Sequence, residues 1–180
     1  MGLPEGVRIE ALRREWVRGA LLVKNAGWWE AYLPWLGEEY LRRMDAGLER
    51  GVAGWTRALD AGSLMPTWVA LTADDTVVGV GAGGPVEALE AIEGRLAGER
   101  APGVTHELGV LYVEAAWRGR GIAEALTAAA IGEHPSHLWV LEENPRAQAF
   151  YAKAGFVADG GMEDLPAEWN GAREIRMVRA

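Results

Sequence analysis

Apolar side chains recur at two spacings along this chain, and the spacings separate predicted helices from predicted strands. Residues 14–36 carry apolar positions at helical intervals, and residues 38–60 repeat them every three or four residues. Gly47, Gly51 and Gly54 lie inside the second stretch, so that helix is expected to break or to pack very closely against a neighbour. The first third of the chain is therefore predicted to be mainly helical.

Runs of β-branched and apolar residues predict the strands. These lie at 6–13, 67–71, 76–80, 106–113, 138–141, 156–157 and 174–178. Two later helices are predicted at 121–132 and 145–154, with Gly155 as the residue that ends the second. The order predicts a single mixed α/β domain over 1–180, without a linker or an internal repeat.

Length and composition narrow the class of protein. The 180 residues contain no apolar run near the ~18 residues of a membrane span, and the N-terminus lacks the layout of a signal peptide. There is no cysteine, which excludes disulfides, thiolate metal sites and a cysteine nucleophile. Three histidines also argue against a dedicated metal site. A cytoplasmic protein without a membrane partner is the expectation.

The net charge and the number of tryptophans indicate which classes of partner the protein can bind. A net charge of -8 argues against nucleic acid, whose binding depends on clustered Lys and Arg. An acidic cleft would instead concentrate ammonium groups. The chain has nine tryptophans, which serve either as core or as an aromatic acceptor pocket, with Trp28, Trp29 and Trp35 as the pocket candidates. Exposed tryptophans within 14–60 would also favour a homodimer interface there.

A glycine-rich basic segment follows the strand predicted at 106–113. It reads Arg118-Gly-Arg-Gly-Ile-Ala123 and runs directly into the helix predicted at 121–132. Such a turn directs main-chain N–H groups and the positive end of a helix dipole at one spot, which suits a phosphate. An ordinary solvated turn is the alternative, but a strand before and a helix after favour phosphate binding.

A second segment lies about twenty residues further on. It reads Asn144-Pro-Arg-Ala-Gln-Ala-Phe-Tyr151 and is followed by Gly155-Phe156. Asn144 before Pro145 is typical of a helix N-cap with proline at the first helical position. Together the two segments resemble the signature of the GNAT family of acyl-CoA-dependent N-acyltransferases. The order of predicted elements is similar to that family as well.

The resemblance implies a fold and a co-substrate. The fold would be a GNAT-like central sheet, mixed and mostly antiparallel, that splays apart at the CoA site and is flanked by about four helices. Residues 106–157 would bind acetyl-CoA and helices within 14–60 would form the acceptor side. A β-bulge at Gly109 is a candidate cause of the splay.

The resemblance also implies the residues that hold acetyl-CoA. The main-chain amides of the loop would bind the pyrophosphate, while Arg118 positions the loop or attracts anions. The main chain of the strand would pair with the pantetheine arm as another strand would. Asn144 would add a side-chain contact. The implied residues are Leu111, Tyr112, Val113, Arg118, Gly119, Arg120, Gly121, Ile122, Ala123 and Asn144.

Catalysis by direct attack on the thioester needs an acid and a base. Tyr151 lies two helical turns after Asn144, and by resemblance it protonates the departing CoA thiolate, while Phe150 suits the core. Glu107, at the start of the splayed strand, is the first choice of base; its alternative is a solvent-facing carboxylate at a strand end. Glu142 and Glu143 are further candidates.

The sequence does not decide which acceptor receives the acyl group. A small-molecule primary amine is the first expectation. A protein or peptide amine and a non-catalytic acyl-CoA-binding module are the alternatives. Some family members that acetylate protein N-termini carry a Glu five residues before the Asn, whereas this chain has Trp139, which weakens that alternative. The general base, the oligomeric state and an acyl group longer than acetyl are equally undecided.

A glycine-rich segment earlier in the chain matches a different binding motif. Gly79-Val-Gly-Ala-Gly-Gly84 satisfies the dinucleotide-binding pattern, with a candidate helix at 86–96 behind it. Pro85 interrupts the join, and no acidic residue ends a strand at the expected distance. The glycines are therefore expected to thin one strand so that a helix or a ligand can approach it.

Overall fold

Seven strands form one sheet in the order β1-β2-β3-β4-β5-β7-β6 in the computed structural model, which describes residues 2–90, 92 and 99–180. The neighbours are antiparallel except for β4 and β5, which are parallel. The strands are β1 (Arg8–Ala11), β2 (Thr67–Leu71), β3 (Val77–Pro85), β4 (His106–Val113), β5 (Ser136–Leu141), β6 (Val157–Asp164) and β7 (Arg173–Arg179). This mixed, mostly antiparallel sheet confirms the predicted fold class.

The helices cover both faces of the sheet. They are α1 (Val17–Ala46), α2 (Leu48–Asp60), α3 (Val86–Glu90), α4 (Ile122–Ile131) and α5 (Pro145–Lys153). Short 3₁₀ turns lie at Arg14–Trp16, Ala115–Trp117 and Ala167–Trp169. Among the described residues, no helix combines the length and the apolar character needed to cross a membrane.

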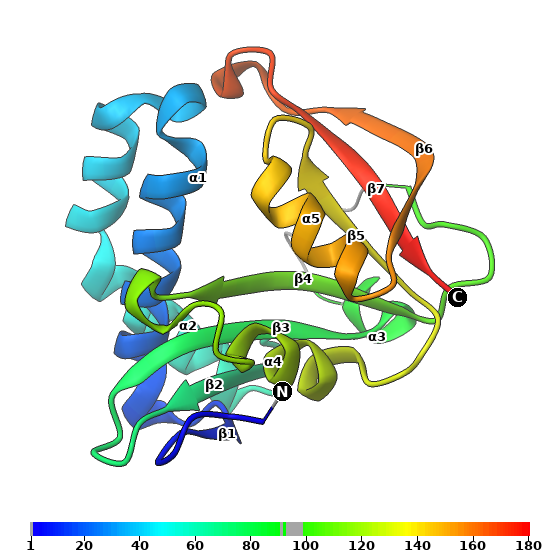
Figure 1. Ribbon diagram of the computed structural model, residues 1–180. Helices are drawn as coiled ribbons and strands as arrows, with labels where there is room; N and C mark the ends of the chain where they lie inside the picture. The colour runs from blue at the N-terminus through cyan, green and yellow to red at the C-terminus, as the bar shows by residue number, and fades with distance from the viewer. Residues whose placement is uncertain (1, 91, 93–98) are drawn as a thin grey trace.

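The sheet splays between its two parallel strands. β4 and β5 pair only at His106 with Ser136 and at Glu107 with His137, after which they separate. Gly109 is the extra residue in β4, because Leu108 pairs with Gly83 whereas Val110 already pairs with Ala82. Figure 1 shows β5, β7 and β6 diverging from β1–β4, with α5 between the two arms. The predicted bulge at Gly109 is confirmed.

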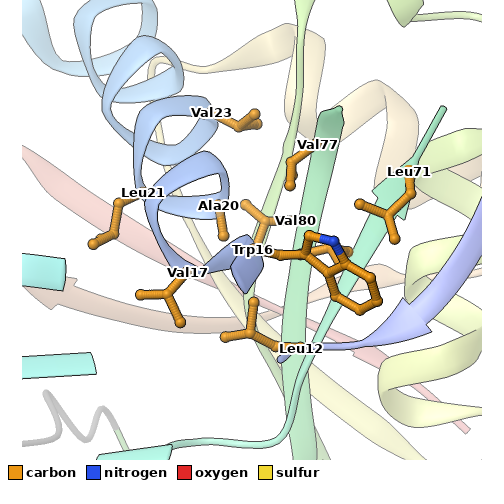
Figure 2. Close-up of a cluster of buried hydrophobic side chains, with 10 residues drawn as sticks. Leu12, Trp16, Val17, Ala20, Leu21, Val23, Leu71, Val77 and Val80 are labelled. Carbon is orange, nitrogen blue, oxygen red and sulfur yellow. The ribbon is translucent and has the colours of Figure 1, made fainter. Parts of the chain in front are cut away.

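Apolar side chains of α1 anchor that helix on β2 and β3. Ala20 of α1 and Trp16, which ends the 3₁₀ turn before it, point toward the strands in Figure 2, whereas Val17 and Leu21 point to the other side of the helix; all four are buried. Val80 of β3 lies in the same cluster and is fully buried. Burying such side chains contributes about 1.5–3 kcal/mol each for the large aliphatic ones, so α1 is firmly placed relative to the splayed edge.

The glycines of β3 allow α4 to approach the opposite face. A β-carbon on Gly79 would lie 3.0 Å from Leu126, and one on Gly81 would lie 3.1 Å from the same side chain. These positions lie within an antiparallel strand, not in a turn between a strand and a helix. The expectation that they thin the strand is confirmed. Residues 91 and 93–96 of the candidate helix 86–96 lie outside the described residues.

Two helical predictions need correction at their boundaries. The helical run continues past 36, but Gly37 departs from helical geometry with φ 74° and kinks α1. The stretch predicted over 38–60 breaks at Gly47, which separates α1 from α2. Positive φ at Gly37 is accessible because glycine has no β-carbon. Local apolar spacing detected the helices but not where their axes change direction.

The predicted strand at 156–157 also differs from the structure. β6 extends to Asp164, although its polar and glycine-rich sequence carries no strand pattern. Its ladder with β7 stabilises it, so pairing overrides local preference. The tryptophans within 14–60 are all buried or half-buried, so they do not form the exposed surface that would favour a homodimer.

Candidate active site

The loop after β4 has the backbone that its glycines suggested. Gly119 and Gly121 adopt φ of 71° and 82°, which residues with a β-carbon rarely occupy, and Gly121 is the N-cap of α4. The Nε of Arg118 donates to the carbonyl oxygen of Val113 at 2.9 Å, which ties the loop back to β4. The loop therefore delivers the chain directly into the positive end of α4.

Arg118 is held by an acidic partner. Its guanidinium forms an ion pair of 2.8 Å with Glu30 of α1, and Arg146 of α5 approaches the same carboxylate at 3.3 Å. The hydrogen bond from Arg118 is the main cause that lowers the pKa of Glu30 below its usual value. Because its charge is paired and its Nε holds β4, Arg118 ties the loop to α1 and β4. Whether it positions the loop for a ligand or attracts anions stays a prediction.

A cavity of about 450 Å³ opens beside this loop on one side of the splay. Its wall includes Leu111, Tyr112, Val113, Arg118, Gly119, Ala123, Asn144 and Tyr151. These are eight of the predicted site residues, and the structure brings them together from β4, the loop and α5. We call this space the loop cavity.

Three predicted residues lie beside the loop cavity instead of on its wall. Arg120 holds its guanidinium 5.3 Å from the ring centre of Trp117, and the side chain of Ile122 is buried beneath α4. Gly121 caps the helix. The binding of a ligand by the main-chain amides of these three residues stays a prediction.

Asn144 has the capping role that its position before proline indicated. Its side-chain oxygen accepts a hydrogen bond of 3.1 Å from the main-chain N–H of Ala147. Gln148 donates to the carbonyl oxygens of Leu141 and Glu142 and so fastens α5 to the end of β5. These bonds fix the direction in which α5 presents Tyr151 to the cavity.

Tyr151 lies where α5 meets the core. Its ring makes edge contacts with Phe150 and Phe156, whose ring centres are 5.4 Å and 6.1 Å away. Burial raises the pKa of Tyr151 above its ordinary value, so the phenol keeps its proton through neutral pH. The core role expected of Phe150 belongs to Phe156, which is 1 % exposed, whereas Phe150 lines the loop cavity.

A second cavity, of about 410 Å³, opens on the other side of the splay. Aromatic rings from α1, β5 and the segment between β6 and β7 line it, as do four carboxylates and one lysine. Those residues are Trp28, Tyr32, Trp139, Trp169, Glu107, Glu163, Asp164, Glu174 and Lys24. We call this space the acidic cavity. Of the tryptophans predicted to line a pocket, Trp28 does so, while Trp29 donates to Asp45 and Trp35 packs in a neighbouring cluster.

Tyr112 belongs to both cavities. Its phenol oxygen lies 3.2 Å from that of Tyr32, within hydrogen-bonding distance. Burial is the main cause that raises the pKa of both tyrosines. Their side chains therefore stay neutral and form a polar contact between the two cavities.

Glu107 lies in the acidic cavity, but it does not face solvent as one interpretation expected. It is 6 % exposed and shares a hydrogen bond of 3.0 Å with the Nε2 atom of His137, which is also buried. Of the other candidates, Glu142 forms an ion pair of 2.6 Å with Arg173 outside both cavities. Glu143 likewise lines neither cavity.

Sequence reasoning missed three residues of the acidic cavity whose pKa departs from its ordinary value, and it missed Glu163 and Asp164 as well. Burial raises the pKa of Glu174 to about 7, and burial lowers the pKa of Lys24 to about 8. Tyr32 is the third. Helical spacing placed Lys24 and Tyr32 on the same helix as Trp28, but Glu174 comes from the other end of the chain and no local pattern marked it. In the part of the chain that the structure describes, no three His, Asp or Glu side chains gather as a metal site.

Comparison with known proteins supports the architecture. A family model described as acetyltransferase (GNAT) domain matches residues 65–158, which is more than half of the chain. No curated protein sequence matches the chain. Among solved structures, the PaiA N-acetyltransferase of Thermoplasma acidophilum, in complex with coenzyme A, is 17% identical with a TM-score of 0.64. The alignment covers 96% of this chain and 98% of that one.

Two other solved structures share the fold but differ in their described substrates. Ribosomal-protein-alanine N-acetyltransferase of Brucella melitensis is 21% identical with a TM-score of 0.65, covering 96% of this chain and 98% of that one. A variant of the spermidine N-acetyltransferase SpeG of Vibrio cholerae is 17% identical with a TM-score of 0.59, covering 97% and 94%. These identities establish the fold and leave the acceptor open. On the match of the family model, the chain belongs to the GNAT family of acyl-CoA-dependent N-acetyltransferases.

Proposed function

We propose that this enzyme transfers the acetyl group of acetyl-CoA to a primary amine of a small molecule. The observation that carries the proposal is the meeting of the loop cavity and the acidic cavity at Tyr112. About 410 Å³ is within the range of small-molecule sites, and carboxylates on its wall favour an ammonium group. The acceptor would enter the acidic cavity and meet acetyl-CoA across the splay.

The loop cavity has the features that acetyl-CoA requires. The positive-φ glycines Gly119 and Gly121 allow main-chain amides from Gly119 to Ala123 to converge on a pyrophosphate at the start of α4. Beyond Glu107, β4 has left its pairing with β5, so the main chain of Leu111–Val113 is available for the amides of the pantetheine arm. Asn144 keeps a second oxygen lone pair beyond the one that caps α5.

Tyr151 is proposed as the general acid. The neutral amine attacks the thioester carbonyl carbon, the bond from carbon to sulfur breaks, and the thiolate accepts the phenol proton. An ordinary phenol already has a higher pKa than an ordinary thiol, and burial raises the pKa of Tyr151 further, so transfer to a free thiolate alone would be uphill. The phenol therefore donates a hydrogen bond to the sulfur first, and the surplus proton on the new amide nitrogen restores the phenol.

Glu107 is proposed as part of the catalytic set in the acidic cavity. Its carboxylate, held by His137, adds negative charge close to where β4 and β5 part. That charge favours an incoming ammonium group. Removal of the ammonium proton is then assigned either to Glu107 or to another carboxylate of the same wall.

Substitution of Tyr151 tests the function directly. The Tyr151→Phe enzyme should lose about 10²-fold or more in turnover, the scale of general acid catalysis, while its acetyl-CoA affinity by calorimetry stays within a factor of two. Thiol release would be followed with a panel of arylalkylamines, diamines and amino acids. An unchanged rate would remove Tyr151 from the acid role.

A peptide acceptor is the alternative, and the same assay separates the two. Peptides with free N-termini should give no thiol release, because the segment around Pro166 and Trp169 packs against Trp28 and Tyr32 and narrows the acidic cavity. Release with peptides and none with the amine panel would establish the peptide function instead.

A further inference from the structure

Glu174 occupies a position on β7 from which it faces the acidic cavity. It pairs in register with Leu141 at the end of β5 and with Glu163 on β6. Residues directly opposite on antiparallel strands point to the same face, so the two carboxylates, Glu163 and Glu174, lie side by side. Both line the acidic cavity together with Trp28, Tyr32 and Trp139.

The arginines nearest to Glu174 along β7 are engaged elsewhere. Arg173 forms its ion pair with Glu142 at 2.6 Å, and Arg176 forms one with Asp159 at 2.9 Å. Within the described residues, no ion pair or hydrogen bond joins the Glu174 side chain to another group. Like charges opposite each other without a cation are unfavourable, so this pair of strands is suited to receive a positively charged ligand.

The charge of Glu174 reaches the tyrosines at the splay. It contributes to raising the pKa of Tyr32 and of Tyr151, which places the carboxylate within electrostatic range of the proposed acid. The other charged groups on the cavity wall are Lys24 of α1, Glu107 of β4, and Glu163 and Asp164 of β6.

We infer that Glu174 is the base that takes the proton from the acceptor ammonium, an inference that rests on the proposed small-molecule function. It meets the two demands on such a base: it lies on the wall of the acceptor space, and no cation neutralises it among the described residues. Burial and the neighbouring Glu163 bring its pKa to about 7, which suits proton transfer near neutral pH.

The proton and electron balance is complete with these groups. Glu174 accepts one proton from the ammonium, and the freed lone pair forms the bond from nitrogen to the carbonyl carbon. The bond from carbon to sulfur breaks, and the sulfur leaves with its electron pair and takes the proton of Tyr151. The second nitrogen proton returns to Tyr151, and Glu174 releases its proton to solvent.

Two acceptors of nearly the same shape separate this role from binding. 2-Phenylethylamine is protonated at pH 7, whereas O-benzylhydroxylamine has an oxygen in place of one methylene and is already unprotonated. Aromatic walls make both suitable probes. Glu174→Gln should lower kcat with 2-phenylethylamine by about 10²-fold or more and leave kcat with O-benzylhydroxylamine within about threefold.

The pH profile adds an independent test with variants of neighbouring carboxylates. In the wild-type enzyme, kcat/KM for 2-phenylethylamine should rise through pH 7, and Glu174→Gln should abolish that limb. Glu163→Gln should move the limb to lower pH, because Glu163 is one of the causes that raise the pKa of Glu174. Glu168→Gln, an exposed residue outside the cavity wall, should leave the profile unchanged.

The outcomes distinguish this inference from the function on which it rests. Equal losses with both acceptors in Glu174→Gln, or loss of the acidic limb in Glu107→Gln while Glu174→Gln retains it, would overturn the role of Glu174 alone. If the wild-type enzyme binds acetyl-CoA but acetylates no amine of the panel, the small-molecule function fails and the inference falls with it.

Discussion

The phenol oxygens of Tyr32 and Tyr112 lie 3.2 Å apart and join α1 to β4 where the two cavities meet. Tyr112 is on the wall of both cavities, and the ring of Tyr32 also packs edge-on against Trp28 and Trp169. One hydrogen bond thus connects the aromatic wall of the acidic cavity to the strand proposed to bind the pantetheine arm. Its loss should affect stability first and catalysis second.

Removal of either hydroxyl takes away one hydrogen-bond partner of the other buried phenol. We expect Tyr32→Phe and Tyr112→Phe each to lower the free energy of unfolding by about 1–2 kcal/mol, since an unsatisfied buried polar group carries its desolvation penalty. The double variant should cost no more than one of the single variants, because both polar atoms are then gone. Urea denaturation of the four proteins measures the coupling, and strictly additive losses would contradict a shared bond.

Gly27 allows α1 to pass across Tyr112. A β-carbon at position 27 would overlap the Tyr112 ring, with Cε1 only 2.9 Å away. Gly27→Ala should therefore cost about 1–3 kcal/mol of stability and raise KM for the amine, because the ring must move out of its place between the cavities. Thermal denaturation and steady-state kinetics check the two effects.

Gly54 provides the matched control for that substitution. It lies in α2 with open space around its β-carbon position, so Gly54→Ala meets no steric conflict. Alanine is the better helix former by about 1 kcal/mol, and we expect a modest gain in stability with unchanged kinetics. A loss of stability in both variants would show that helix propensity and packing do not explain the Gly27 effect.

The loop glycine Gly119 should matter for acetyl-CoA in particular. Gly119→Ala introduces a β-carbon into empty space but at φ 71°, so the strain falls on the backbone that is proposed to bind the pyrophosphate. We expect acetyl-CoA affinity by calorimetry to fall by about tenfold, in line with a backbone strain of about 1–2 kcal/mol. Gly103→Ala, with φ 77° and the same empty surroundings, should lose similar stability and keep its affinity.

Glu174 should impose a pH dependence on stability that is independent of any acceptor. Its pKa is raised from 4.5 to about 7 by folding, so the native state binds the proton more tightly than the unfolded state. The contribution of Glu174 to the free energy of unfolding is therefore largest below pH 4.5. It declines by up to about 3 kcal/mol as pH rises through 7. Glu174→Gln should raise Tm at pH 8 and change it little at pH 5; equal changes at both pH values would contradict the buried charge.

Local sequence was informative wherever one segment contained the whole feature. The Arg118–Ala123 turn, the Asn144 cap with Pro145, and the bulge at Gly109 all depend on neighbouring residues, and the structure has each of them. The loop cavity was accordingly predictable, because strand, turn and helix follow one another in the chain. β6 was not, since its stability depends on pairing with β7 across a connection that carries no strand pattern.

The acidic cavity could not be predicted from the sequence, because its residues come from segments that are far apart in the chain. Trp28 and Tyr32 come from α1, Trp139 from β5, and Glu163 and Glu174 from β6 and β7, so no spacing in the chain relates them. Burial then decides which carboxylate titrates near pH 7, and burial is a property of the packed molecule. The sequence by itself determined the fold class and the glycine turn that is proposed to bind phosphate, because short-range spacing and backbone chemistry are sufficient for both. The acidic cavity and its titrating carboxylate arise only when the two arms of the sheet are packed against α1.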